Sequence, residues 1–159
     1  MSDAVFRSRL DELLADETER ARRLAETLRA DQRIFGGRDP AAIEQAATRL
    51  QELVTAVEAV EAERLTLLQQ AGFEADKAGM EACLAAHDHD GSLHRRWQEL
   101  LSLAAQCRTQ NQINAGVVEI SRQRTQKALH ILRGEGSSGT YGPAGRRGGP
   151  GASRPLGKA

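Results

Sequence analysis

Residues 40–68, PAAIEQAATRLQELVTAVEAVEAERLTLL, decide the fold because their seam residues recur at alternating spacings of three and four. This repeat places the residues along one side of a helix and predicts a coiled-coil-like seam. Asp39 is suited to cap the first amides, Pro40 suits the first helical position, and Gly72 ends the helix. The seam positions are Ile43, Ala47, Leu50, Val54, Val57, Glu61, Arg64 and Leu68. We expect the seam to be weaker or hydrated at its two charged members.

Residues 4–35 predict a helix of the same kind, which Gly36 and Gly37 end. Its apolar stripe consists of Phe6, Leu10, Leu13 or Leu14, Ala21, Leu24 and Leu28. Two long amphipathic segments that are joined by a short loop predict an antiparallel helical hairpin.

A third long helix is predicted to begin near Ser92, with Ser92 or Asp90 as its cap, after a short helix over residues 76–86. Its seam runs for some 40 residues, or ~60 Å at about 1.5 Å per residue. The first half of this seam is apolar, whereas the second half contains Asn111, Asn114, Ser121 and Thr125. Buried amides need hydrogen-bond partners, so we expect the second half to project beyond the bundle or to pack loosely.

The fold class that follows is all-α, an antiparallel bundle of three long helices with one short helix before the third. We expect residues 1–133 to form this helical domain and residues 134–159 to form a flexible tail. Nine of the 15 glycines and three of the four prolines lie in that tail. Such a composition buries too little apolar surface to offset the entropy of ordering, which predicts disorder.

Composition excludes several classes of protein. Lys and Arg together number 22, as do Asp and Glu, so a uniformly basic nucleic-acid-binding protein is not expected. Four spaced cations in the tail are better explained as solubilising than as a nucleic-acid or membrane site. No apolar run approaches the ~20 residues that span a bilayer, so we expect no stable membrane insertion and a cytoplasmic location.

Candidate sites for chemistry are few, and we expect no catalytic residue, no metal and no cofactor. The residues His87, Asp88, His89, Asp90 and His94 resemble a metal-ligand cluster, but in a Gly-ended loop they are better explained as a solvated turn. Cys83 and Cys107 lie on apolar stripes, where a thiol acts as a small hydrophobe. No recurring Glu-x-x-His pair indicates a di-metal bundle enzyme.

Asn111-x-x-Asn114 leaves two interpretations open. These amides form either a polar layer that fixes the register of the bundle or a patch that pairs better with a bound peptide helix. A second stripe of Val117, Ile120, Lys127 and Ile131 offers apolar surface on a neighbouring face of the same helix.

Four segments, in this order, resemble the FlgN family of flagellar export chaperones. They are Leu50-Gln51-Glu52-Leu53-Val54 with Glu61 to Leu68, Trp97-Gln98-Glu99-Leu100-Leu101, Asn111-Gln112-Ile113-Asn114-Ala115-Gly116-Val117-Val118, and Thr140-Tyr141-Gly142-x-x-Gly145. One departure is Ala115, where the family commonly has Gly, and this makes any hinge there stiffer.

The resemblance implies a cytoplasmic type III export chaperone and no enzymatic activity. Its clients would be hook-associated (hook–filament junction) proteins, held by their C-terminal helical segments, protected from premature assembly and delivered to the export gate. The client would be held by the C-terminal part of the chaperone.

A client-binding groove is therefore expected on the third helix, where an apolar client helix can pack. Asn111 and Asn114 would set its register. Tyr141 would anchor the chaperone to the gate or fold over the client, or it is a tail residue with no binding role. The groove residues are Val117, Val118, Ile120, Ala128, Ile131 and Leu132. The alternative is a structural coiled-coil protein that associates with itself. The sequence does not decide between a monomer and a homodimer.

Overall fold

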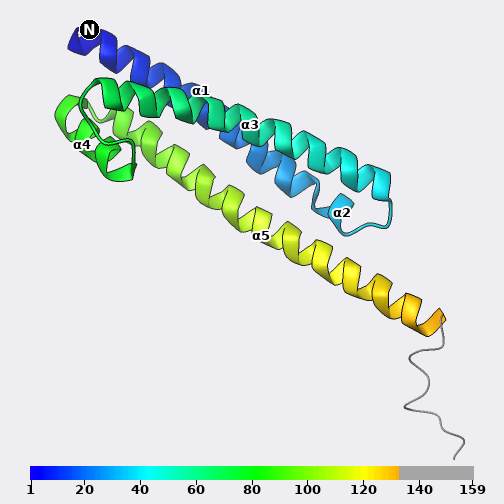
Figure 1. The fold of residues 1–159 in the computed structure, drawn as a ribbon. Helices are drawn as coiled ribbons and strands as arrows, with labels where there is room; N and C mark the ends of the chain where they lie inside the picture. Colours follow the sequence, from blue (N-terminus) through cyan, green and yellow to red (C-terminus); the bar gives the residue numbers. More distant parts are fainter. Residues whose placement is uncertain (133–159) are drawn as a thin grey trace, which may run out of the picture. The chain divides into compact units, whose positions relative to one another are not determined.

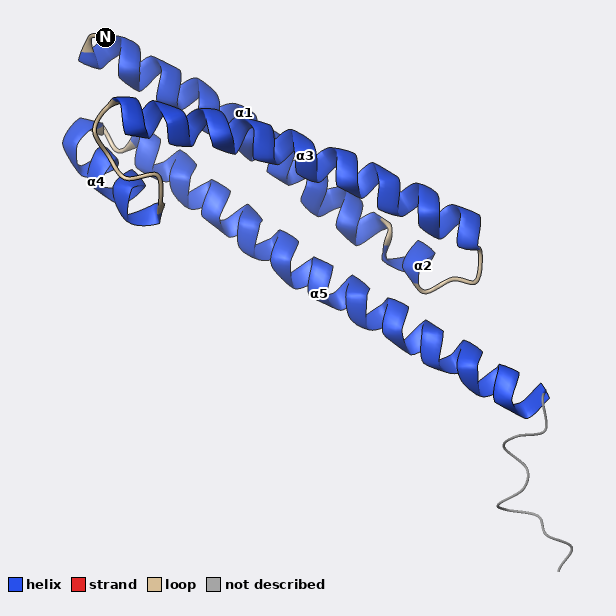
Figure 2. Ribbon diagram, viewed as in Figure 1, coloured by secondary structure: helices blue, strands red, loops and turns tan. Residues whose placement is uncertain are grey.

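The computed structural model describes residues 1–132, and every regular element of that part is an α-helix (Figures 1 and 2). The helices are α1 (Asp3–Ala30), α2 (Gln32–Phe35), α3 (Pro40–Gln70), α4 (Lys77–His87) and α5 (Ser92–Leu132). The all-helical fold class is thus confirmed for these residues. The chain divides into two compact units, Met1–Ser121 and Arg122–Ala159.

Helices α1 and α3 lie side by side in the first unit (Figure 1). Arg9 near the start of α1 pairs with Glu63 near the end of α3, with 2.9 Å between Nη2 and Oε2. At the other end, Nη2 of Arg49 lies 3.4 Å from Oδ1 of Asp31, which follows α1 directly. These pairs show that α1 and α3 run in opposite directions, as the hairpin prediction requires.

The helix expected over residues 4–35 is interrupted at Asp31, so its prediction as a single helix is wrong. Asp31 is buried, its N–H donates to the carbonyl of Thr27, and its carboxylate faces Arg49 of α3. The four-residue α2 follows and buries Phe35. At the interruption, the carboxylate of Asp31 lies close to Arg49 of α3. No glycine or proline beside Asp31 indicates this break in the helix.

Local sequence signals set both ends of α3. Oδ1 of Asp39 accepts hydrogen bonds from the N–H groups of Ala41 and Ala42, at 3.1 and 3.3 Å, and Pro40 is the first helical residue. Gly72 follows the helix with a φ of 85°, a left-handed conformation that favours glycine. The predicted cap and stop are both confirmed.

The hydrophobic core lies where α1, the end of α3, α4 and the first part of α5 meet. Its largest fully buried side chains are Leu10, Leu14, Leu68, Met80, Cys83 and Leu93. Aliphatic side chains thus form most of the core, as the low aromatic content predicts, and Trp97 is the one buried indole.

The seam of α3 is neither open nor hydrated at Arg64, contrary to expectation. Nε of Arg64 donates to Oε2 of Glu17 at 2.7 Å, and Nη2 donates to Oε1 at 3.2 Å. The guanidinium also lies over the ring of Trp97, 4.9 Å from its centroid. One buried arginine of α3 therefore contacts both α1 and α5, because a buried charge is tolerated when its donors are paired.

Helix α5 runs in the same direction as α1 within the first unit. Nε of Arg96 contacts Oδ1 of Asp11 at 2.5 Å, and further along both helices Nδ2 of Asn114 donates to the carbonyl of Leu28 at 2.8 Å. The loose packing expected of the second half of α5 is therefore wrong at Asn114, which is buried.

Candidate functional site

Exposed apolar side chains are concentrated on the second half of α5. Of the eight large apolar side chains that are exposed among residues 1–132, only Met1 and Val5 lie elsewhere. The other six are Ile113, Val118, Ile120, Leu129, Ile131 and Leu132. Single exposed apolar residues are ordinary on a protein surface, but three within residues 113–120 of the first unit, and three within residues 129–132 of the second, each indicate an interaction surface.

Asn114 is held by the fold itself. Its side chain is buried, Nδ2 donates to the Leu28 carbonyl, and Oδ1 accepts from Nε2 of Gln110 at 3.0 Å. The same Gln110 nitrogen lies 3.1 Å from Oε1 of Gln32. Both polar atoms of Asn114 are satisfied, so this residue links α5 to the end of α1 in the free protein.

Asn111 lies one turn earlier and is exposed. It borders an open pocket of about 170 Å³ within the first unit. The pocket is lined by Phe35, Leu50, Asn111, Asn114, Ala115 and Val118. The two asparagines therefore differ in environment, because one faces the bundle and the other lies at the rim of an apolar recess.

Val117 and Val118 differ in the same way. Cγ1 of Val117 lies 3.0 Å from the position that a Cβ on Gly36 would occupy, so the half-buried Val117 packs against the loop after α2. Val118 is exposed and borders the pocket, and Ile120 is exposed as well. Of the groove residues expected in the first unit, Val118 and Ile120 are the ones with large accessible apolar surface.

The second unit holds the remaining described groove residues, on the end of α5. Ala128 is exposed, and the exposed fractions of Ile131 and Leu132 are 74% and 82%. Tyr141 lies outside the described residues.

Two exposed apolar residues, Ile113 and Leu129, were not among the groove residues predicted from the sequence. Ile113 precedes Ile120 by seven residues, which is about two helical turns, so both lie on nearly the same face. That spacing is the signal that would have found Ile113. Leu129 precedes Leu132 by three residues, a helical spacing that is the signal for its exposure on the same side of α5.

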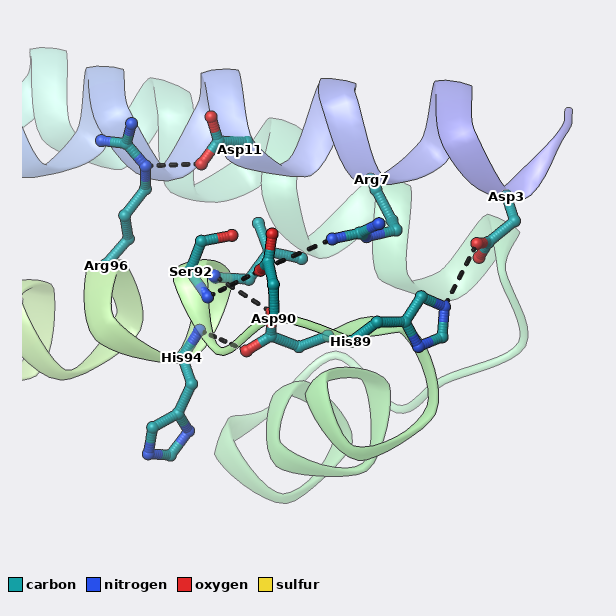
Figure 3. Close-up of polar contacts among 10 residues, drawn as sticks. Asp3, Arg7, Asp11, His89, Asp90, Ser92, His94 and Arg96 are labelled. Atoms are coloured by element: carbon teal, nitrogen blue, oxygen red, sulfur yellow. Dashed lines mark hydrogen bonds and ion pairs between the residues drawn. The ribbon is translucent and has the colours of Figure 1, made fainter.

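Charged residues bring the α4–α5 loop onto the first turns of α1 (Figure 3). The carboxylate of Asp3 contacts His87 Nδ1 through a hydrogen bond and lies 3.6 Å from His89 Nε2, while Arg7 lies 3.7 Å from Asp90. The hydrogen bond from His87 holds the pKa of Asp3 below its ordinary value.

The other carboxylates of this loop cap α5. Asp88 accepts from the N–H groups of Leu93 and His94, and Oδ1 of Asp90 accepts from the N–H of Ser92 at 2.9 Å. Hydrogen bonds from Ser92 lower the pKa of Asp90 to about 2. Within residues 1–132, no three His, Cys, Asp or Glu side chains are placed to hold a metal ion. The cluster acts as a capped turn.

The two cysteines are free thiols in apolar surroundings. Burial raises the pKa of Cys83 to about 11, and it also raises the pKa of Cys107. Sγ of Cys107 lies 3.6 Å from the carbonyl of Ala21. A thiol with a raised pKa is a poor nucleophile near neutral pH, in keeping with a packing role.

Comparison with known proteins gives one match. The family model described as FlgN protein matches residues 1–148. No curated protein and no solved structure matches the chain. Among residues 1–132, no helix is both long and apolar enough to cross a membrane.

Proposed function

Since the chain belongs to the FlgN family, the family of flagellar export chaperones, we propose that it holds hook-associated proteins by their C-terminal helical segments and delivers them to the export gate. Membership supports a chaperone role in flagellar export and hook-associated proteins as clients. FlgN proteins are not known as enzymes.

The observation that carries this proposal is the concentration of exposed apolar side chains on residues 113–132. A protein that shields an assembly-prone partner needs an apolar surface that its own fold leaves unused. The residues that we propose to form or support the client-binding surface are Asn111, Asn114, Val117, Val118, Ile120, Ala128, Ile131, Leu132 and Tyr141. To these we add Ile113 and Leu129 because both are exposed.

The residues differ in the roles that we propose for them. Val118 borders the open pocket beside Phe35 and Leu50, which suits an apolar side chain of a client helix. Asn111 at the rim would hydrogen-bond the client and fix its register. Asn114 would act indirectly, by holding α5 to Leu28 of α1 so that its neighbours keep their positions.

Delivery is the second part of the proposal. Tyr141 would contact the export gate or fold over the client, and residues 134–159 would form the flexible segment that carries it. Residues 1–133 would form the chaperone domain, with α1, α3 and α5 as its bundle of three long helices. We place the whole process in the cytoplasm, where the client must be kept from assembling.

The alternative function is a structural coiled-coil protein that associates with itself through the same apolar residues. Light scattering on the purified chain, with and without a hook-associated protein, separates the two. A stable complex of one chaperone and one client supports the proposal. Homo-oligomers that never bind the client would support the alternative, and a homodimer that dissociates on binding would fit the chaperone.

A further inference from the structure

Two exposed cations without an ion-pair partner among residues 1–132, Arg124 and Lys127, lie near the end of α5. Residues 122–132, RQRTQKALHIL, contain three cations and no Asp or Glu. Arg124 and Lys127 are exposed, and neither forms an ion pair within the described part of the chain. In the first unit, Arg9, Arg20 and Arg96 each pair with a carboxylate, whereas the exposed Arg33 and Arg38 form no ion pair among residues 1–132.

These cations share a helix face with apolar residues. Arg124, Lys127, Ala128 and Ile131 stand at positions i, i+3, i+4 and i+7 of α5, which lie on one side of a helix. All four are exposed. The face therefore combines an apolar end at Ile131 with two cations about one and two turns before it.

We propose that the partner of this face is a helix that carries carboxylates among its apolar residues, placed to pair with Arg124 and Lys127. This inference rests on the proposed client binding and adds to it the chemistry of the client segment. Arg124 would bind a carboxylate through two parallel hydrogen bonds, and Lys127 would add a point charge one turn away. The carboxylates would select the client and its register, while the apolar side chains would supply most of the affinity.

The arrangement disfavours a second copy of the chain. In parallel register, or in a centred antiparallel register, the same face on a second copy would bring Arg124 and Lys127 against cations. Like charges across a helix pair are unfavourable. A homodimer would therefore have to use another surface.

The arrangement also disfavours an anionic membrane. A helix that lies on a membrane keeps its cations on the polar face and presents a separate apolar face to the acyl chains. Here Ile131 and Ala128 lie on the same side as Arg124 and Lys127. A protein helix with matching carboxylates satisfies both kinds of residue at once.

The test is the affinity of the full chain for a purified hook-associated protein, measured by calorimetry at about 50 and 300 mM NaCl, which lie on either side of physiological screening. The variant is the double charge reversal Arg124→Glu with Lys127→Glu. The control is Arg33→Glu with Arg38→Glu, which changes net charge equally at exposed positions in and after α2. A second variant, Arg124→Gln with Lys127→Gln, removes the charges while keeping good helix formers.

We expect the reversal to weaken binding about tenfold or more at low salt, the Gln pair to weaken it less, and the control to change it by less than about twofold. The Gln pair should lose most of the salt dependence, whereas the reversal variant should bind better at about 300 than at about 50 mM NaCl because salt screens the repulsion between its glutamates and the client carboxylates. Lys substitutions at client carboxylates should restore binding to the reversal variant alone.

Two results would overturn the proposal while leaving the chaperone function intact. One is wild-type binding that is unaffected by salt and by the reversal. The other is a reversal variant that no longer binds phosphatidylglycerol vesicles, as the wild type does, but keeps the wild-type affinity for the client. If the wild-type chain binds no hook-associated protein at either salt concentration, the proposed function and this inference both fall.

Discussion

Arg64 of α3 and Glu17 of α1 form a buried ion pair in which both side chains are only 5% exposed. Two hydrogen bonds join them, and the guanidinium stacks on Trp97 of α5. The pair therefore links the hairpin to the helix that carries the proposed client surface. Removing the pair should lower the free energy of unfolding of the whole first unit.

Replacing Arg64 by Met should destabilise the protein by about 3–5 kcal/mol, because the carboxylate of Glu17 is left buried without its partner. The double variant Arg64→Met with Glu17→Leu should recover most of that loss, since no charge then stays buried. Urea unfolding followed by circular dichroism gives both values. A single variant as stable as the wild type would show that Glu17 has another partner or reaches water.

Replacing Asn114 by Ala should lower the free energy of unfolding by about 1–3 kcal/mol, because it leaves the Leu28 carbonyl without its donor. Asn111→Ala is the matched comparison, one turn away and exposed, and should change stability by less than about 0.5 kcal/mol. Equal effects of the two substitutions in thermal unfolding would contradict the assignment of Asn114 as the link between α5 and α1.

Replacing Asp90 by Asn should destabilise the protein at neutral pH, because the amide of Ser92 loses its charged acceptor. The pKa of Asp90 is lowered to about 2, so its contribution is present above the ordinary pKa of 3.8 and is lost as the pH falls towards 2. The difference between variant and wild type should therefore shrink between pH 4 and about 2.

Urea midpoints measured across that pH range provide the check. Glu44→Gln is the control, an exposed carboxylate on α3 whose substitution should shift the midpoint little at any pH. A gap for Asp90→Asn that stays constant down to pH 2 would mean that its charge does not stabilise the start of α5.

Replacing Tyr141 by Ala should leave client affinity within about twofold of the wild type while reducing export of the client from flagellated cells. The reason is that Tyr141 is the one aromatic residue of the Gly- and Pro-rich segment 134–159, and an aromatic side chain suits an anchor for a second partner. Calorimetry gives the affinity, and the amount of hook-associated protein in the medium gives export. Normal export would remove Tyr141 from the proposed gate contact.

The sequence predicts the helices well because their signals are local. The repeat in residues 40–68, the cap at Asp39 and the stop at Gly72 all lie within a few residues of the feature that they set. The interruption at Asp31 could not be found in this way. Asp31 faces Arg49, which becomes its neighbour only after the hairpin has formed.

The environments of individual polar residues were less predictable. Arg64 was expected to mark a hydrated position, but its partner Glu17 lies 47 residues away in the chain. Asn114 pairs with a backbone carbonyl, which is present at every residue and leaves no trace in the sequence. Four of the six exposed apolar residues of the second half of α5 could be identified, whereas Ile113, Leu129 and the difference between buried Asn114 and exposed Asn111 were not.

The proposal that the second half of α5 holds the client is best tested with the double variant Val118→Asp with Ile131→Asp. The measurement is the dissociation constant of its complex with a hook-associated protein. Val5→Asp serves as the control because Val5 is 56% exposed on α1, compared with 41% for Val118 on α5. We expect unchanged helicity in all variants and at least about a hundredfold weaker binding for the double variant alone, since two apolar contacts are lost. Binding of the double variant within about twofold of the wild type would contradict the claim that the second half of α5 holds the client.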